Sequence, residues 1–165
     1  NGVEIKFGSE YFDDFYSIYS EKLKQENAVH DSYTTLKKMV DSNEKGILFL
    51  CGVAYLNGKI EAGILNGSDQ FGAYYLFGGS SRTAHNGSFR LLHWELIKKY
   101  KAMNFKYYKL GAHREFEMLT DKHARLASFK MGFGAEIQQG YQYTLIIHPI
   151  KFWLYNKLVQ LKSKV

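Results

Sequence analysis

A run of apolar segments separated by turn signals constrains the fold more than any other feature of this sequence. The segment Ile47–Leu56 is rich in residues that favour strands. Asn57-Gly58 is a strong signal for a two-residue hairpin, so Lys59–Asn66 should return as a second strand. After a turn, Phe71–Phe77 predicts a third strand. The three strands form an antiparallel meander, and helices should cover both faces because the strands are apolar on both sides.

The segments around the meander alternate between helical and extended patterns. Apolar side chains recur at helical spacing over residues 9–25, after Asp31 and, in a long helix, after Asn86 as the expected N-cap. Asn104 is expected to end the long helix with a left-handed backbone. The remaining expected elements are strands at 1–7, 105–110 and 136–147, a helix at 122–131, and a final helix opened by Pro149. This order predicts an α/β (α+β) fold, with residues 1–165 as a single domain.

Composition restricts the compartment and the kind of partner. The single cysteine, Cys51, excludes a disulfide framework and a cysteine-based metal site, which fits a reducing, cytoplasmic interior. A net charge of +6 favours anionic partners, although a purely solubilising role is an equal alternative. No stretch has the pattern of a membrane span or a signal peptide, and no histidine–carboxylate spacing indicates a metal. Because the chain begins with Asn1 and not with methionine, we expect it to be a piece of a longer protein.

The loop at residues 78–88 is the strongest candidate for an anion site. It contains Gly78-Gly79, leaves a strand and runs into the start of the long helix, where free backbone N–H groups and the helix dipole attract anions. Arg82 could add a two-pronged contact to a phosphate or carboxylate. The alternative is a flexible connection that only caps the helix. The residues expected to bind an anionic group here are Ser80, Arg82, Asn86, Gly87 and Ser88.

Several further side chains are candidates for catalysis or substrate binding. Lys130, between apolar and glycine neighbours, could stabilise an oxyanion, and its alternative is a solvated charge at a helix end. Glu95 could be a buried base or could lie at the edge of the apolar stripe. His85 and His113 lie in loops and could act as acid or base, although lone loop histidines are usually unremarkable. In the Tyr74–Tyr75 and Tyr107–Tyr108 pairs, one ring of each pair should face any cleft beside the sheet, with core packing as the alternative.

Four motifs, taken in order, resemble one known family. They are Tyr75-Leu76-Phe77-Gly78-Gly79-Ser80, Leu92-His93-Trp94-Glu95, Tyr107-Tyr108-Lys109-Leu110-Gly111 and Phe129-Lys130-Met131-Gly132-Phe133-Gly134. From about Gly46 to Phe152 the chain resembles the acyltransferase (GNAT-type) domain of the FemABX peptidoglycan aminoacyltransferases and the related BioF2-like, or acetyltransferase 6, proteins. The resemblance implies a mixed, splayed sheet, with a donor cleft where the third meander strand and the strand at 105–110 part.

The resemblance also implies a reaction, the transfer of an acyl group to an amine. In the FemABX branch the donor is an aminoacyl-tRNA and the acceptor is a peptidoglycan precursor. A functional Phe-Lys pair in that branch corresponds to Phe129 and Lys130, and the lysine stabilises the tetrahedral intermediate. Glu95 is the expected base, and Tyr75, Tyr108 and His113 are expected to line the substrate cleft.

Three features differ from the family pattern. FemABX enzymes have two such domains, so this chain could be the C-terminal half of a two-domain enzyme. Lys109 stands where an aspartate is usual, and His85 stands where the phosphate loop of coenzyme A-dependent members has a glycine. The last difference counts against ordinary acetyl-CoA use. The leading hypothesis is an N-acyltransferase of the FemABX/GNAT type, with an aminoacyl group as the expected acyl group. The alternatives are an acyl-CoA-dependent N-acetyltransferase and a non-catalytic domain that binds tRNA or an anionic glycan. No resident cofactor is implied, and the donor is aminoacyl-tRNA or acyl-CoA.

Overall fold

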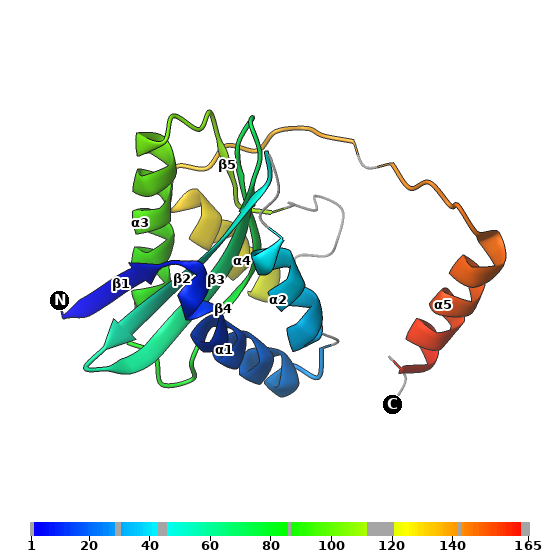
Figure 1. The fold of residues 1–165 in the computed structure, drawn as a ribbon, viewed down its shortest axis with the longest axis horizontal. Helices are drawn as coiled ribbons and strands as arrows, with labels where there is room; N and C mark the ends of the chain where they lie inside the picture. The colour runs from blue at the N-terminus through cyan, green and yellow to red at the C-terminus, as the bar shows by residue number, and fades with distance from the viewer. Residues whose placement is uncertain are drawn as a thin grey trace. The chain divides into compact units, whose positions relative to one another are not determined.

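A single five-stranded sheet forms the centre of the protein. The structure is a computed structural model that describes residues 2–28, 31–42, 46–85, 87–111, 121–141 and 143–162. The strands are β1 (Val3–Phe7), β2 (Leu48–Leu56), β3 (Lys59–Ser68), β4 (Ala73–Ser80) and β5 (Tyr108–Lys109), in the spatial order β1-β2-β3-β4-β5 (Figure 1). β1 to β4 are antiparallel, whereas β5 is parallel to β4. The predicted meander and the mixed α/β class are confirmed.

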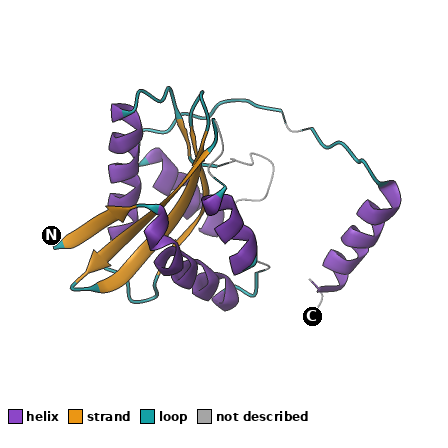
Figure 2. Ribbon diagram, in the orientation of Figure 1, coloured by secondary structure: helices purple, strands orange, loops and turns teal. Residues whose placement is uncertain are grey.

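Helices cover both faces of the sheet, as the apolar strands predict (Figure 2). The short 3-10 helix η1 (Ser9–Tyr11) leads into α1 (Phe12–Gln25), which lies with α2 (Tyr33–Asp41) on one face. The opposite face is covered by α3 (Ser88–Ala102). Residues Asn1–Ala135 form one compact unit. Its last helix, α4 (Asp121–Met131), contacts α3 through the stacked rings of Phe129 and Phe89, whose centroids are 5.7 Å apart.

The positions that need a left-handed backbone agree with the sequence prediction. Asn57 and Gly58 have φ values of 52° and 74°, which build the hairpin turn between β2 and β3. Asn104 ends α3 with a φ of 62°. Local residue choice therefore fixes these two chain reversals.

The prediction that Gly78 and Gly79 belong to the loop is wrong. Both lie in β4, which pairs with β3 at Ile64↔Gly78, Gly63↔Gly79 and Ala62↔Ser80. An ideal Cβ at Gly79 would lie 2.6 Å from Cδ of Lys22, and one at Gly78 only 2.8 Å from a backbone oxygen. These glycines therefore allow close packing within and above the sheet, and the true loop begins at Ser81.

Residues Glu136–Val165 form a second unit. The expected strand at 136–147 is not formed at the positions that the structure describes; the backbone there has no paired neighbour, and the next element is α5 (Pro149–Lys162). Tyr141 and Tyr143 are 79% and 89% exposed. Strand-forming side chains do not make a strand without a second backbone for hydrogen bonding, which is why the prediction fails.

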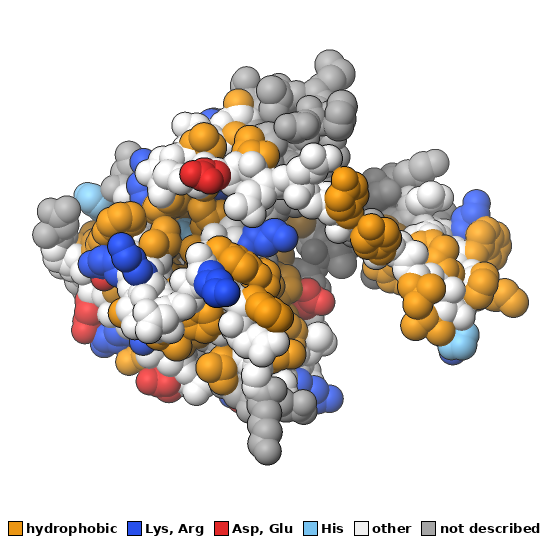
Figure 3. All heavy atoms as spheres, turned by 90° about the horizontal axis from the view of Figure 1, so that it is seen from above, with side chains coloured by type: hydrophobic (Ala, Val, Ile, Leu, Met, Phe, Trp, Pro, Cys, Tyr) orange, Lys and Arg blue, Asp and Glu red, His pale blue; other side chains and the backbone are white. Residues whose placement is uncertain are grey.

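Surface composition and helix length bear on the charge and membrane predictions. On the face seen in Figure 3, Lys and Arg side chains are scattered among apolar ones and do not gather in one patch. Among the described residues, none of the helices combines the length and the apolar character required to cross a membrane.

Candidate functional site

The sheet opens at the junction of β4 and β5. The two strands pair only at Ala73↔Tyr108 and Tyr74↔Lys109. Beyond Tyr74, β4 continues to Ser80 and pairs with β3 on its other side. In the part of the chain that the structure describes, this portion of β4 has no strand paired along its outer edge. Its backbone groups there can accept an extended ligand in place of a strand.

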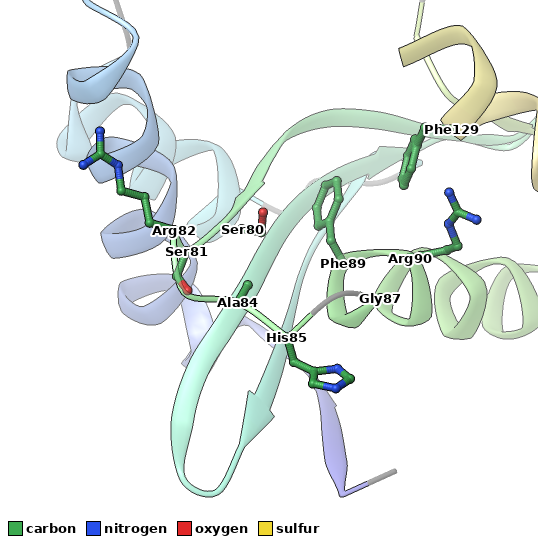
Figure 4. Close-up of a pocket in the computed structure, with 9 residues that line it drawn as sticks. All are labelled: Ser80, Ser81, Arg82, Ala84, His85, Gly87, Phe89, Arg90 and Phe129. Carbon is green, nitrogen blue, oxygen red and sulfur yellow. The ribbon is translucent and has the colours of Figure 1, made fainter. Parts of the chain in front are cut away.

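A pocket of about 700 Å³ lies beside the end of β4. This volume is within the range of ordinary ligand sites. Figure 4 shows the loop after β4, the first turn of α3 and Phe129 of α4 around it. The lining residues are Ser80, Ser81, Arg82, Ala84, His85, Gly87, Phe89, Arg90 and Phe129. The structure thus brings together five of the candidates named from the sequence: Ser80, Arg82, His85, Gly87 and Phe129.

The pocket lining suits an anion. It includes two arginines, Arg82 and Arg90, and no carboxylate. The Oγ atom of Ser81 is buried and has no hydrogen-bond partner among the residues that the structure describes. Gly87 is the N-cap of α3, with a φ of 112° that favours glycine and no side chain to occupy the first N–H groups. The helix start and the two guanidinium groups together favour a phosphate-bearing ligand.

The two arginines differ in orientation. Nε of Arg82 donates to Oε1 of Gln25 at 3.0 Å, and in Figure 4 its guanidinium is turned away from Phe129. The guanidinium carbon of Arg90 lies 5.7 Å from the ring centroid of Phe129. The sequence prediction missed Arg90, although its place in the first turn of the helix was a usable signal.

A buried carboxylate holds the inner side of the loop. Glu61 on β3 is only 7% exposed and accepts hydrogen bonds from the backbone N–H of His85 and from the hydroxyl of Ser88. Ser88, expected to bind the anion, is instead buried beneath the loop and does not line the pocket. Asn86, the expected N-cap, lies outside the described residues, and the structure assigns the N-cap to Gly87.

Lys130 lies at the end of α4 next to the end of β5. It is half-buried, and its Nζ is 3.7 Å from the position that a Cβ on Gly111 would occupy. Burial lowers the pKa of its ammonium. The neighbouring Phe129 lines the pocket, whereas Lys130 is not among the lining residues.

Glu95 lies at the edge of the apolar stripe of α3, which is one of the two expected alternatives. Its side chain is 31% exposed and forms a 2.6 Å ion pair with Lys98. Its role as a base stays a prediction. His113 lies outside the described residues. Within the described residues, no group of three His, Cys, Asp or Glu side chains could hold a metal ion.

Tyr75 and Tyr108, expected in the cleft, belong to an aromatic cluster around His93. His93 is fully buried, and its ring contacts those of Phe89 and Tyr75 at centroid distances of 4.7 and 5.0 Å. The Tyr108 hydroxyl donates to Oδ1 of Asn66 at 2.7 Å and lies 3.3 Å from Nδ1 of His93. Burial raises the pKa of Tyr75 to about 12 and that of Tyr108 further, and lowers the pKa of His93 to about 4. Both tyrosines are therefore neutral, and neither lines the pocket.

The fold, with its opened sheet and anion pocket, corresponds to a known family. Residues 2–123 match the family model of the acetyltransferase (GNAT) domain. The chain belongs to this family and is an enzyme of the transferase class. The search of curated proteins found no match.

Solved structures with this fold have names from the same class. An aminoglycoside acetyltransferase from an uncultured soil metagenomic sample, solved with sisomicin, is 17% identical; the match covers 88% of this chain and 98% of that chain, with a TM-score of 0.60. A possible acetyltransferase from Clostridium difficile 630 is 17% identical, with 90% and 100% covered and a TM-score of 0.61. A predicted acetyltransferase from Clostridium acetobutylicum, solved with acetyl-CoA, is 13% identical, with 87% and 96% covered and a TM-score of 0.61. At identities of 13–17%, the similarity to these structures shows a shared fold only.

Proposed function

We propose that this protein is a cytoplasmic N-acyltransferase that uses an acyl-CoA donor. The observation that carries the proposal is the pocket at the start of α3, which contains two arginines and no carboxylate and adjoins the open edge of β4. A diphosphate fits the pocket with its two arginines, and an extended, amide-containing chain fits the open edge of β4. The relative from Clostridium acetobutylicum, which was solved with acetyl-CoA, supports the same donor.

In this arrangement the diphosphate of the donor binds between the N-terminus of α3 and the guanidinium of Arg90. The unpartnered hydroxyl of Ser81 donates to one of its oxygens. The amide groups of the donor arm hydrogen-bond to the outer edge of β4 beyond Tyr74. This edge leads from the pocket towards the point where β4 and β5 part, so the thioester lies near that junction.

The reaction is attack by a neutral amine on the thioester carbonyl. The new C–N bond forms as the carbonyl becomes a tetrahedral oxyanion, whose collapse breaks the C–S bond and expels the thiolate. The proton lost by the amine nitrogen is taken up by this thiolate, which gives the amide and the free thiol of coenzyme A. The chain contributes mainly positioning and charge stabilisation. Lys130, beside the end of β5, is the residue we assign to the oxyanion.

The charge of the protein favours a particular kind of acceptor. With a net charge of +6, the protein repels polycations at long range. We therefore favour a neutral or singly charged amine, in contrast to an aminoglycoside such as sisomicin, with which one of the relatives was solved.

The proposal is tested by calorimetry with coenzyme A and by release of free thiol from acetyl-CoA in the presence of amines. We expect binding in the micromolar range. Arg90→Ala should weaken it about tenfold, the value of one charge-assisted hydrogen bond. Lys98→Ala, which removes an exposed cation from the same helix, is the matched control and should bind normally. If coenzyme A does not bind at millimolar concentration, the acyl-CoA proposal is wrong.

Lys130→Ala tests the catalytic assignment. The variant should bind coenzyme A normally but lose turnover, because the lysine acts on the oxyanion and not on the diphosphate. Thermal unfolding checks that the variant is folded. Full activity would show that Lys130 has no role in the chemistry.

Aminoacyl transfer from tRNA is the second candidate function. It is favoured by Lys130 and its neighbour Phe129, which correspond to the Phe-Lys pair of the FemABX branch, and by the occupied N–H of His85, which is unavailable to a diphosphate. In that case we expect a second domain of the same kind upstream and a peptidoglycan precursor as the acceptor. Transfer of a labelled amino acid from charged tRNA, without coenzyme A binding, would favour this function. Salt-dependent tRNA binding without any transfer would instead indicate a non-catalytic domain.

A further inference from the structure

Glu61 contacts the loop between β4 and α3 at three places. Its backbone oxygen accepts the N–H of Ser81 at 2.9 Å. One carboxylate oxygen, Oε2, accepts the backbone N–H of His85 and also lies 3.4 Å from the hydroxyl of Ser88. These contacts extend from the first residue of the loop to the first residue of α3. One residue of β3 therefore fixes both ends of the loop.

The contacts lie on the inner side of the loop. Glu61 is 7% exposed and Ser88 is 1% exposed, and neither lines the pocket. The outer side of the same loop contributes Ser81, Arg82 and Gly87 to the pocket. Glu61 therefore does not compete with a ligand for space, and its effect on a ligand must pass through the loop.

The carboxylate bonds the residue two positions before the N-cap of α3 and the hydroxyl of the first residue of the helix. Gly87, the N-cap, has no side chain to accept a hydrogen bond. Among the described residues no Lys, Arg or His forms an ion pair with Glu61, so its charge is stabilised by the loop groups and by the positive end of the helix. Hydrogen bonds from neutral donors to a buried carboxylate are stronger than neutral ones. The loop conformation thus depends on this single acidic side chain.

We propose that Glu61 is a positioning residue for the acyl donor, which holds the β4–α3 loop in the conformation whose outer side binds the diphosphate. The inference rests on the proposed function, because the diphosphate is the group that this loop positions. It also explains why His85 can replace a glycine. Glu61 fixes the His85 backbone by its N–H, and in Figure 4 the imidazole points away from Phe89 and Phe129.

A competing effect has the opposite sign. A carboxylate behind the loop repels a diphosphate in front of it. If repulsion dominated, removing the charge would strengthen donor binding. If positioning dominates, as we propose, removing the side chain weakens it.

The test compares Glu61→Ala and Glu61→Gln with Asp69→Ala. Asp69 is a matched control because its carboxylate accepts the N–H groups of Phe71 and Gly72 in the turn at the other end of β4, away from the pocket. We expect Glu61→Ala to raise the KM for acetyl-CoA and the Kd for coenzyme A about tenfold or more, with kcat changed less than about twofold. Glu61→Gln retains an oxygen acceptor and should lie between Glu61→Ala and the wild type. Asp69→Ala should leave the Kd for coenzyme A unchanged, because the Asp69 carboxylate is not part of the pocket assigned to the diphosphate.

Hydrogen exchange at the His85 amide provides a readout that is independent of the donor. The amide should exchange at least about tenfold faster in Glu61→Ala than in the wild type. Tighter or unchanged donor binding in both Glu61 variants would overturn the inference. So would equal losses of kcat and donor affinity in the Glu61 and Asp69 variants. A wild-type protein that binds no coenzyme A would contradict the proposed function, whereas normal exchange at His85 in Glu61→Ala contradicts the holding role of Glu61 itself.

Discussion

The two faces of the sheet are packed with different kinds of side chain. The face under α1 and α2 has large apolar residues, and its buried cluster consists of Phe12, Phe15, Tyr19, Leu36, Val40, Cys51, Val53 and Leu65. The face under α3 has small residues such as Ala54, Ala62 and Ala73 in its cluster. It also surrounds the buried polar side chains of His93 and Asn66.

The polar groups on the α3 face are incompletely satisfied. Three of their atoms are buried and have no hydrogen-bond partner within the described part of the chain: Nδ2 of Asn66, Nε2 of His93 and the hydroxyl of Tyr100. All three residues contact Tyr108. Each such atom costs about 1–3 kcal/mol, so this face gives up stability that the α1 face retains. The α3 face is also the one on which the pocket lies, so the sheet separates a well-packed apolar face from the face with the candidate site.

The largest predicted effect is a loss of stability when a large side chain is removed from the face under α1. Phe15→Ala should lower the free energy of unfolding by about 3–5 kcal/mol, because it leaves a cavity under α1 at a fully buried position. Denaturant unfolding followed by circular dichroism measures this loss. Phe71→Ala, at an exposed aromatic residue, is the control and should cost far less. Comparable losses in the two variants would contradict a core centred on α1.

The next prediction concerns His93 and pH. Its folded pKa of about 4 lies below the ordinary value of 6.5, so the folded state binds fewer protons than the unfolded state between these values. The contribution of His93 to the free energy of unfolding is constant above pH 6.5. It falls as the pH drops from 6.5 towards 4, by roughly 3 kcal/mol in total. His93→Phe should remove this portion of the pH dependence. Subtracting the variant curve from the wild-type curve separates His93 from the carboxylates, and identical curves would show that His93 is not buried as a neutral group.

A smaller effect is expected from adding volume to the α1 face. An ideal Cβ at Gly63 would lie 3.0 Å from the Cα of Phe15, so Gly63→Ala pushes α1 away from β3. The expected cost is about 1–3 kcal/mol. Gly140→Ala is the control, because no atom of the described residues lies within 4 Å of its ideal Cβ. Unfolding curves that do not distinguish the two variants would mean that α1 is not held this closely.

The smallest expected effect is slow reaction of the Cys51 thiol with a disulfide reagent. Cys51, the only cysteine, is buried on the α1 face, and burial raises the pKa of its thiol to about 12. A disulfide reagent should therefore label the protein only as fast as it opens. Rapid labelling at neutral pH would indicate that the α1 face is more open than the structure shows.

Local signals predicted much of the fold. The hairpin at Asn57-Gly58 and the left-handed Asn104 follow from the conformational preferences of single residues. Helical periodicity also located α1 and α3. The same periodicity contained an unused signal, because His93 lies four residues after Phe89 and three before Leu96, within the apolar stripe of α3.

Features that depend on distant contacts could not be predicted in this way. Gly78 and Gly79 suggested a loop, but pairing with β3 makes them part of a strand. Residues 136–147 have the composition of a strand and lack a paired neighbour at the described positions. Glu61 was invisible as a site residue because its partner, His85, lies 24 residues further along the chain. Sequence spacing therefore indicated where the pocket lies but not which side chains hold it.

The two-residue junction between β4 and β5 has a consequence for folding in the cell. Among the described residues, β4 has no paired strand along its outer edge beyond Tyr74. An acyl-CoA donor bound there, as we propose, would act as an additional strand, so its binding free energy would add to the stability of the sheet. At a donor concentration one hundred times the Kd this adds about 2.7 kcal/mol. The metabolic supply of acyl-CoA would then help to set how long each copy of the protein survives proteolysis, as well as how fast it works.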